Sequence, residues 1–139
     1  MQSTKSRLRG AAIGLLVFLG IGAVAGGLAL MIGPEGQIIA LPISMLAGSP
    51  FENYFIPGAI LFAGLGLGSF LIAVLAWRRH PLAPILTAGV GIALLIWLGV
   101  QIAIIGFSND PPLQAIYLVV GVVIGLVGLG WMRREASPA

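Results

Sequence analysis

The chain has 139 residues and a mass of 14.3 kDa, a length that predicts a single domain. Its residues are 59% apolar and 8% charged, against about 45–50% and about 25% in typical soluble proteins, so the composition excludes a soluble globular domain. The net charge is +3, but the basic residues flank apolar runs, where membrane topology explains them and no nucleic-acid partner is expected. With no cysteine and one histidine, we expect no thiol chemistry, no metal site and no cofactor.

Four apolar runs without a charged residue follow one another along the chain. Each is long enough to cross a hydrocarbon core of about 30 Å as a helix. The predicted spans cover residues 10–33, 57–77, 82–107 and 113–132, and residues 34–56 connect the first two. The sequence therefore predicts an all-α integral membrane protein, a four-helix transmembrane bundle over residues 1–139 with short interfacial helices in the long connection.

The charged residues predict how these spans are oriented. The basic residues all precede the first span, lie between the second and third, or follow the fourth: Lys5, Arg7, Arg9, Arg78, Arg79, Arg133 and Arg134. The acidic residues Glu35, Glu52 and Asp110 fall in the connections on the other side. The positive-inside rule then places both termini in the cytoplasm and the 34–56 connection on the outer side of the inner membrane. A cleaved signal ending near Ala25 is the alternative, but the apolar run continues to Ile32, longer than such a signal requires.

Glycines recur at a spacing of four within the predicted spans. Such small-xxx-small pairs let helix backbones approach closely in lipid. They are Gly10/Gly14, Gly22/Gly26, Gly64/Gly68 and Gly121/Gly125. The pairs predict tight packing, either within one bundle or between protomers, and the sequence leaves both arrangements open.

The 34–56 connection is too apolar for a solvated loop and too short and broken for another span, so we expect it in the membrane interface. Pro42 predicts the start of a short helix. Ser49–Glu52 matches a capping box and predicts a further helical turn through Tyr54. Pro57 is then expected to begin the second span.

The ionisable residues outside the basic clusters have ordinary structural interpretations. Glu52 fits the glutamate of the capping box, and Glu35 and Asp110 fit turn or cap residues beside prolines. His80, next to two arginines in a short turn, fits a topology or headgroup residue better than a metal ligand. No catalytic triad, carboxylate pair or HExxH motif is present in the sequence, which leans against an enzyme.

Polar side chains near the outer ends of the third and fourth spans form the candidate site. Gln101 lies about 9 Å below the outer surface, with Trp97 one turn deeper, while Gln114 and Tyr117 share one face of the fourth span. They either hydrogen-bond between helices or line a small pocket covered by residues 52–54. The candidate ligand-binding residues are Glu52, Asn53, Tyr54, Trp97, Gln101, Gln114 and Tyr117.

Parts of the sequence around this site carry a family resemblance. The stretches LPISMLAGSPFENYFIPG (residues 41–58), WLGVQ (97–101) and PPLQAIY (111–117) resemble an uncharacterised family of small bacterial four-span membrane proteins. The resemblance extends over spans two to four and implies a four-span topology in a bacterial inner membrane, with no reaction attached. The position of Gln101 is often glutamate in these relatives, so the neutral amide here weakens a proton-coupled function.

These observations give one leading functional hypothesis and two alternatives. The leading hypothesis is a non-enzymatic inner-membrane protein whose outer-side pocket binds a lipid-like ligand or a partner transmembrane helix. A small transporter or channel, built by oligomerisation, is the first alternative. A lipid-modifying membrane enzyme with Glu52 as acid or base is the second. The expected partners are therefore membrane lipid, further copies of the chain or another membrane protein.

Overall fold

The computed structural model describes residues 4–36, 50–105 and 113–136. The regular secondary structure in these ranges is helical, with four helical segments long and apolar enough to cross a membrane. Their elements are α1 (Thr4–Ile32), α2 (Phe55–Ile60), the π-helix η2 (Leu61–Leu67), α3 (Gly68–Trp77), α4 (Ala83–Ile105) and α5 (Leu113–Ala136). The predicted four-helix transmembrane fold is confirmed.

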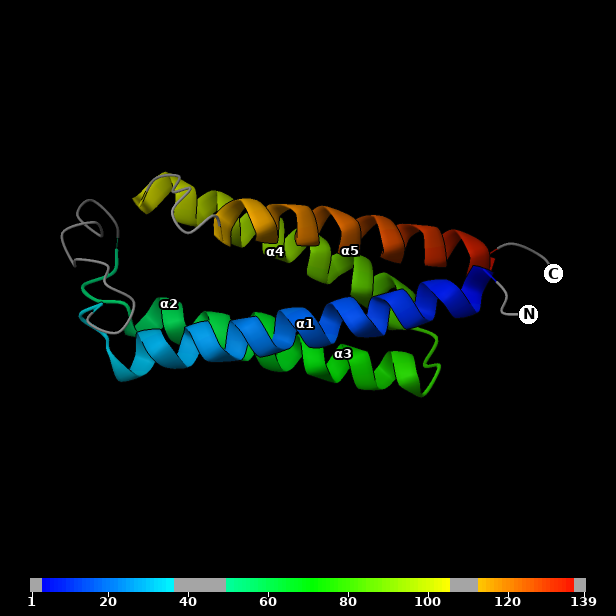
Figure 1. The fold of residues 1–139 in the computed structure, drawn as a ribbon, viewed down its shortest axis with the longest axis horizontal. Helices are drawn as coiled ribbons and strands as arrows, with labels where there is room; N and C mark the ends of the chain where they lie inside the picture. Colours follow the sequence, from blue (N-terminus) through cyan, green and yellow to red (C-terminus); the bar gives the residue numbers. More distant parts are fainter. Residues whose placement is uncertain (1–3, 37–49, 106–112, 137–139) are drawn as a thin grey trace.

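The helices form two antiparallel hairpins that pack against each other (Figure 1). In the first, α1 lies along the continuous segment α2–η2–α3, and in the second α4 lies along α5. The hairpins meet mainly where α1 contacts α5, and less extensively where α3 contacts α4. Both described chain ends lie at one end of the bundle (Figure 1), which we call the basic end because it carries the seven basic residues.

Three of the described spans are longer than their predicted limits. Helix α1 begins at Thr4 rather than Gly10, and α5 continues to Ala136 rather than ending at Met132. The prediction used the charge-free runs, but a helix can extend into the headgroup layer, where arginine and lysine side chains reach water. The second span begins at Phe55, so Pro57 occupies its third position, where a missing N–H breaks no helical hydrogen bond.

The interior of the bundle is narrow, and the outward faces are apolar. Leu16, Leu19 and Ile124 are the largest apolar side chains that are fully buried. Large side chains such as Ile21 and Leu126 are more than half exposed, as expected for helices that are surrounded by lipid.

Glycines determine how closely the helices approach. A side chain at Gly128 would overlap the backbone of Ala88, and one at Gly91 would overlap the backbone of Gly125. In the first hairpin, a Cβ at Gly27 would lie 2.7 Å from the carbonyl oxygen of Gly58. These contacts bring two helix backbones together without intervening side chains, as small residues permit in membranes.

The predicted glycine pairs are only partly used in this packing. Gly22 packs beneath the Tyr117 hydroxyl, and Gly121 packs against Leu95. By contrast, built Cβ atoms at Gly10, Gly14 and Gly64 would meet nothing within 4 Å. Of the two arrangements that the sequence left open, packing within the bundle does not apply to the Gly10/Gly14 pair, because both residues lie on the outward face of α1.

A tight turn joins α3 to α4 at the basic end. The N–H of His80 donates to the carbonyl of Leu75 at 2.9 Å and that of Arg79 to the carbonyl of Ala76 at 3.1 Å, the pattern of a Schellman motif. Arg79 occupies the left-handed position, with φ 58°, where glycine is usual. The Nδ1 atom of His80 accepts a hydrogen bond from the N–H of Leu82 at 3.1 Å, so His80 orders the start of α4.

Candidate functional site

Tyr54, one of the predicted ligand-binding residues, is buried at the end of the bundle opposite the basic end. Its side chain is 4% exposed and packs with Leu30 of α1, and Ile104 of α4 adjoins them. Its backbone N–H donates to the carbonyl of Pro34 at 2.7 Å. Burial raises the pKa of the Tyr54 hydroxyl above 10.0, because the charged phenolate is poorly solvated there. Tyr54 therefore ties the returning connection to both hairpins.

The helical turn predicted through Tyr54 does not form in the described residues 50–54, so that prediction is wrong. Residues 51–54 are non-helical, and Ser49 lies outside the described residues, as does the helix expected at Pro42. The N-cap of α2 is Tyr54, without a side-chain cap hydrogen bond, and Asn53 lies one residue before it; the Oδ1 of Asn53 accepts a hydrogen bond from the N–H of Phe55 at 3.0 Å. Asparagine satisfies a free N–H at a helix start as well as serine does, and Glu52 is left exposed to solvent.

Glu35 and Asp110 are the acidic residues for which a turn or cap role was predicted. Glu35 lies in a turn closed by a hydrogen bond of 2.9 Å from the N–H of Gly36 to the carbonyl of Gly33, as predicted. Gly36 has a φ of 81°, which favours glycine. Asp110 lies outside the described residues.

Tyr117 lies at the contact between the two hairpins. Its hydroxyl sits over Gly22 of α1, and its ring centroid lies 6.0 Å from that of Phe18, with the planes tilted by 30°. A side chain at position 22 would occupy the space of the Tyr117 hydroxyl, so the glycine is needed for this contact. Tyr117 thus packs α5 against α1.

The register of α4 against α5 places the two predicted glutamines at one level. Gly91 lies against Gly125, and Leu95 against Gly121. Since the helices are antiparallel, the same register puts Gln101 beside Ala115, adjacent to Gln114. Gln114 is 6% exposed, whereas Gln101 is half-buried.

Trp97, the last of the predicted site residues, is partly buried and packs against the main apolar core. The predicted set is therefore divided between several contacts. Tyr54 closes the connection, Tyr117 joins α5 to α1, and the glutamines lie at the level where α4 passes α5.

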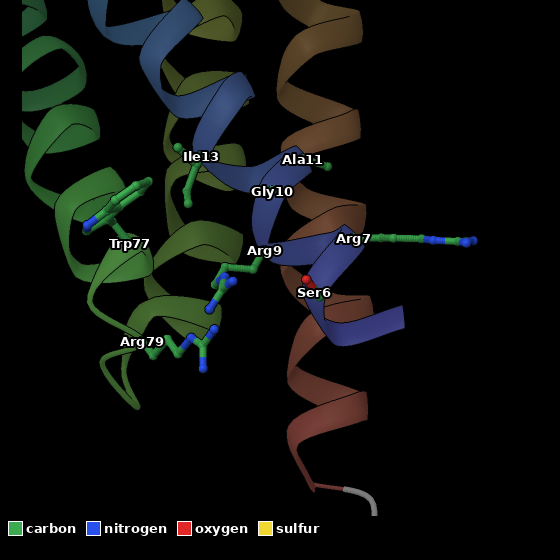
Figure 2. Close-up of a pocket in the computed structure, with 8 residues that line it drawn as sticks. All are labelled: Ser6, Arg7, Arg9, Gly10, Ala11, Ile13, Trp77 and Arg79. Carbon is green, nitrogen blue, oxygen red and sulfur yellow. The ribbon is translucent and has the colours of Figure 1, made fainter. Parts of the chain in front are cut away.

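A groove at the basic end was not anticipated from the sequence. It is an open groove between the first turns of α1 and the end of α3, with a volume of about 650 Å³. The residues that line it are Ser6, Arg7, Arg9, Gly10, Ala11, Ile13, Trp77 and Arg79. Figure 2 shows the guanidinium groups of Arg9 and Arg79 directed toward each other below Trp77, while Arg7 projects away. The basic clusters were visible in the sequence, but the pairing of Arg9 with Arg79 depends on the packing of α1 against α3.

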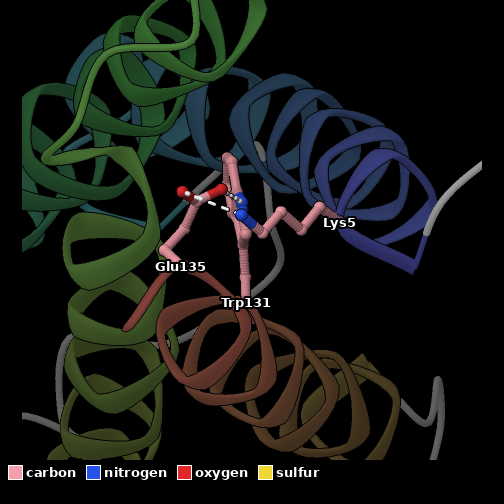
Figure 3. Close-up of polar contacts among 3 residues, drawn as sticks. All are labelled: Lys5, Trp131 and Glu135. Carbon is pink, nitrogen blue, oxygen red and sulfur yellow. Dashed lines mark hydrogen bonds and ion pairs between the residues drawn. The ribbon is translucent and has the colours of Figure 1, made fainter. Parts of the chain in front are cut away.

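The acidic residue at the basic end, Glu135, is engaged elsewhere. Its Oε2 lies 3.8 Å from Lys5 Nζ, and its Oε1 accepts a hydrogen bond of 3.2 Å from the indole N–H of Trp131 (Figure 3). Among the described residues, no carboxylate lines the groove itself. The groove therefore has a positive potential.

The comparisons and the described side chains add no further site. Within residues 4–36, 50–105 and 113–136, no group of three or more histidine, cysteine or acidic residues is placed to hold a metal ion. Comparison with family models, curated proteins and solved structures finds no match for the chain.

Proposed function

We propose that the protein is a non-enzymatic protein of a bacterial inner membrane, with both termini cytoplasmic, that binds a lipid-like ligand. The observation that carries the proposal is the groove between α1 and α3 at the basic end. Ala11, Ile13 and Trp77 provide apolar contacts, while Arg9 and Arg79 provide charge. A molecule with a charged head and an apolar tail matches both halves of this lining.

The position of the groove also supports a lipid ligand. Beyond the groove both helices expose large apolar side chains, among them Ile21 of α1 and Leu71 of α3. An acyl chain lying along these side chains would remain in the hydrocarbon layer while its headgroup occupies the groove. The ligand site therefore moves from the predicted outer-side pocket to the cytoplasmic end.

The outer-side residues are proposed to have a structural role instead. Tyr54 and Tyr117 contact neighbouring helices through buried or tightly packed surfaces. Glu52, the acid of the enzymatic alternative, is exposed in the connection between α1 and α2, at the opposite end from the arginine groove. These positions favour ligand binding at the basic end over catalysis at Glu52.

The oligomeric transporter remains the second candidate because α1 and α4 expose small residues. Gly14 on α1 and Gly89 on α4 lie on outward faces with open space around them. Such surfaces permit close helix association between protomers. This candidate predicts a defined oligomer, which the lipid-binding proposal does not require.

Native mass spectrometry after gentle extraction from the cell membrane tests both candidates. We expect the wild type to carry a discrete added mass that corresponds to lipid. Gly10→Leu, which places a side chain in the groove, should reduce this adduct. Gly14→Leu is the matched control, because Gly14 is equally open but does not line the groove. A ligand-free wild type would contradict lipid binding, and a bare higher oligomer would favour the transporter.

A further inference from the structure

We infer that Arg9 and Arg79 jointly bind the phosphate of an anionic phospholipid headgroup. This inference rests on the proposed lipid binding and names the chemical class of the ligand. Arg9 comes from the second turn of α1 and Arg79 from the turn after α3, yet their guanidinium groups converge in the groove (Figure 2). Two planar guanidinium groups offer several N–H donors that match phosphate oxygens.

The charge around these two arginines is not balanced by the residues of the groove. Every described ionisable residue that lines it is basic. Glu135, the acid at this end, contacts Lys5 and Trp131. An anion from outside the chain is therefore the complementary ligand.

Trp77 indicates that the anion belongs to a lipid. Its side chain is 76% exposed, although it is one of the largest apolar groups of α3. Exposed tryptophans of membrane proteins concentrate at the level of the lipid headgroups. Because Trp77 lines the same groove as the two arginines, their guanidinium groups lie near the level of lipid phosphates.

The backbone of Arg79 gives an independent reason to assign its side chain a role. Its φ of 58° is left-handed, and glycine is the usual residue at this position of a Schellman motif. Glycine would relieve the backbone strain at this position, so an arginine there indicates that the side chain has a function. Binding the phosphate is such a function.

The ligand class predicts a preference between two common headgroups. Phosphatidylglycerol carries a net negative charge, whereas phosphatidylcholine adds a cation beside its phosphate, which the two arginines would repel. An arginine that contacts the phosphate directly should contribute no less than the roughly fivefold of a basic residue near an anionic surface, so losing both contacts should weaken phosphatidylglycerol binding at least about 25-fold.

The test titrates the purified full chain with each lipid and measures bound lipid by native mass spectrometry. Arg9→Gln/Arg79→Gln should bind phosphatidylglycerol at least about 25-fold more weakly than the wild type. The matched control is Arg133→Gln/Arg134→Gln, which removes the same charge from two basic residues at the same end of the bundle that do not line the groove. Equal losses in both variants, or no loss in the first, would overturn the inference.

Two further arms separate recognition of a lipid phosphate from simple charge attraction and from a site for free phosphate. Arg9→Lys/Arg79→Lys retains the charge and should bind more tightly than the glutamine variant but less tightly than the wild type; this arm keeps the test valid if the glutamine variant does not fold.

Inorganic phosphate should not displace the lipid at equal concentration, and displacement would assign the site to a soluble phosphate. A wild type that holds both lipids equally refutes the headgroup assignment alone, whereas one that holds neither refutes the proposed function as well.

Discussion

The indole N–H of Trp131 donates a hydrogen bond to Oε1 of Glu135, one helical turn further along α5, at 3.2 Å. Lys5 of α1 approaches the other carboxylate oxygen at 3.8 Å. Trp131 is buried, whereas the side chains of Lys5 and Glu135 are 45% and 49% exposed. The hydrogen bond is therefore the more buried of the two interactions, and the ion pair is the more exposed to solvent.

Substitutions of Glu135 should separate these two interactions. Glu135→Ala removes both and leaves the Trp131 N–H without its acceptor, so we expect a loss of about 1–2 kcal/mol in the free energy of unfolding. Glu135→Gln retains an acceptor oxygen and removes only the exposed ion pair, with an expected loss of about 0.5 kcal/mol. Unfolding by SDS in mixed micelles measures both, and similar losses would show that the ion pair dominates.

Gly91 should be the most sensitive glycine of α4. In Gly91→Ala, the new Cβ would meet backbone atoms of Gly125 and the carbonyl oxygen of Gly121. Backbone cannot yield as a flexible side chain can, so we expect a loss of about 1–3 kcal/mol. Gly89→Ala is the control, since it faces open space and should gain up to about 1 kcal/mol from helix propensity. The same SDS titration decides, and equal effects would contradict the close approach.

The start of the second span should depend on Asn53 rather than on Glu52. Asn53→Ala removes the acceptor for the Phe55 N–H, which should cost about 1 kcal/mol of stability. Glu52→Ala, at the exposed neighbouring position, should leave thermal unfolding unchanged. A larger effect at Glu52 would restore the capping box that the sequence predicted.

Alkaline conditions should destabilise the protein through Tyr54. Burial raises the pKa of its hydroxyl in the folded state above 10.0, so the folded protein holds the proton more tightly than the unfolded chain. The resulting stability is fully present below about pH 10 and is lost as the pH rises through the folded pKa. Tyrosinate absorbance in Tyr117→Phe reports Tyr54 alone, because the chain has two tyrosines. A titration midpoint at or below the ordinary value would contradict the burial of this hydroxyl.

Arg79→Gly should make the protein more stable and a weaker lipid binder. Glycine adopts the left-handed conformation without the penalty of about 1–2 kcal/mol that a side chain incurs, so the thermal unfolding temperature should rise. Arg78→Gly is the control, because Arg78 has an ordinary φ of −82° and gains nothing from this change. A decrease in the stability of Arg79→Gly would argue against backbone strain at this position.

The fold was predictable because four charge-free runs and clustered bases are properties of the chain alone. The contacts that make the groove are not, since Arg9 lies in α1 and Arg79 in the turn after α3, and nothing in their sequence spacing relates them. Glycine spacing likewise identifies helix faces made of small residues but does not show whether another helix packs on them. Gly91 faces a neighbouring helix, whereas Gly14 faces outward.

The sequence before the second span also did not determine which side chain satisfies the free N–H groups at a helix start. Ser49 and Asn53 are both residue types that can satisfy a free N–H at a helix start, and in the described part of the chain Asn53 does so for Phe55. The π-helical stretch Leu61–Leu67 had no counterpart in the prediction, because apolar runs with frequent glycine carry no pattern that separates α- from π-helical hydrogen bonding.

The inward face of α5 has a consequence for changes in chain length. Its row of inward-facing residues is spaced alternately by three and four: Gln114, Tyr117, Gly121, Ile124, Gly128 and Trp131. One residue inserted in the middle of α5 would turn everything beyond it by about 100°. Gly130 would then take the inward place of Trp131, and the indole would turn away from the interior. Insertions and deletions in α5 should therefore be tolerated near its ends but, within it, only in units of seven residues.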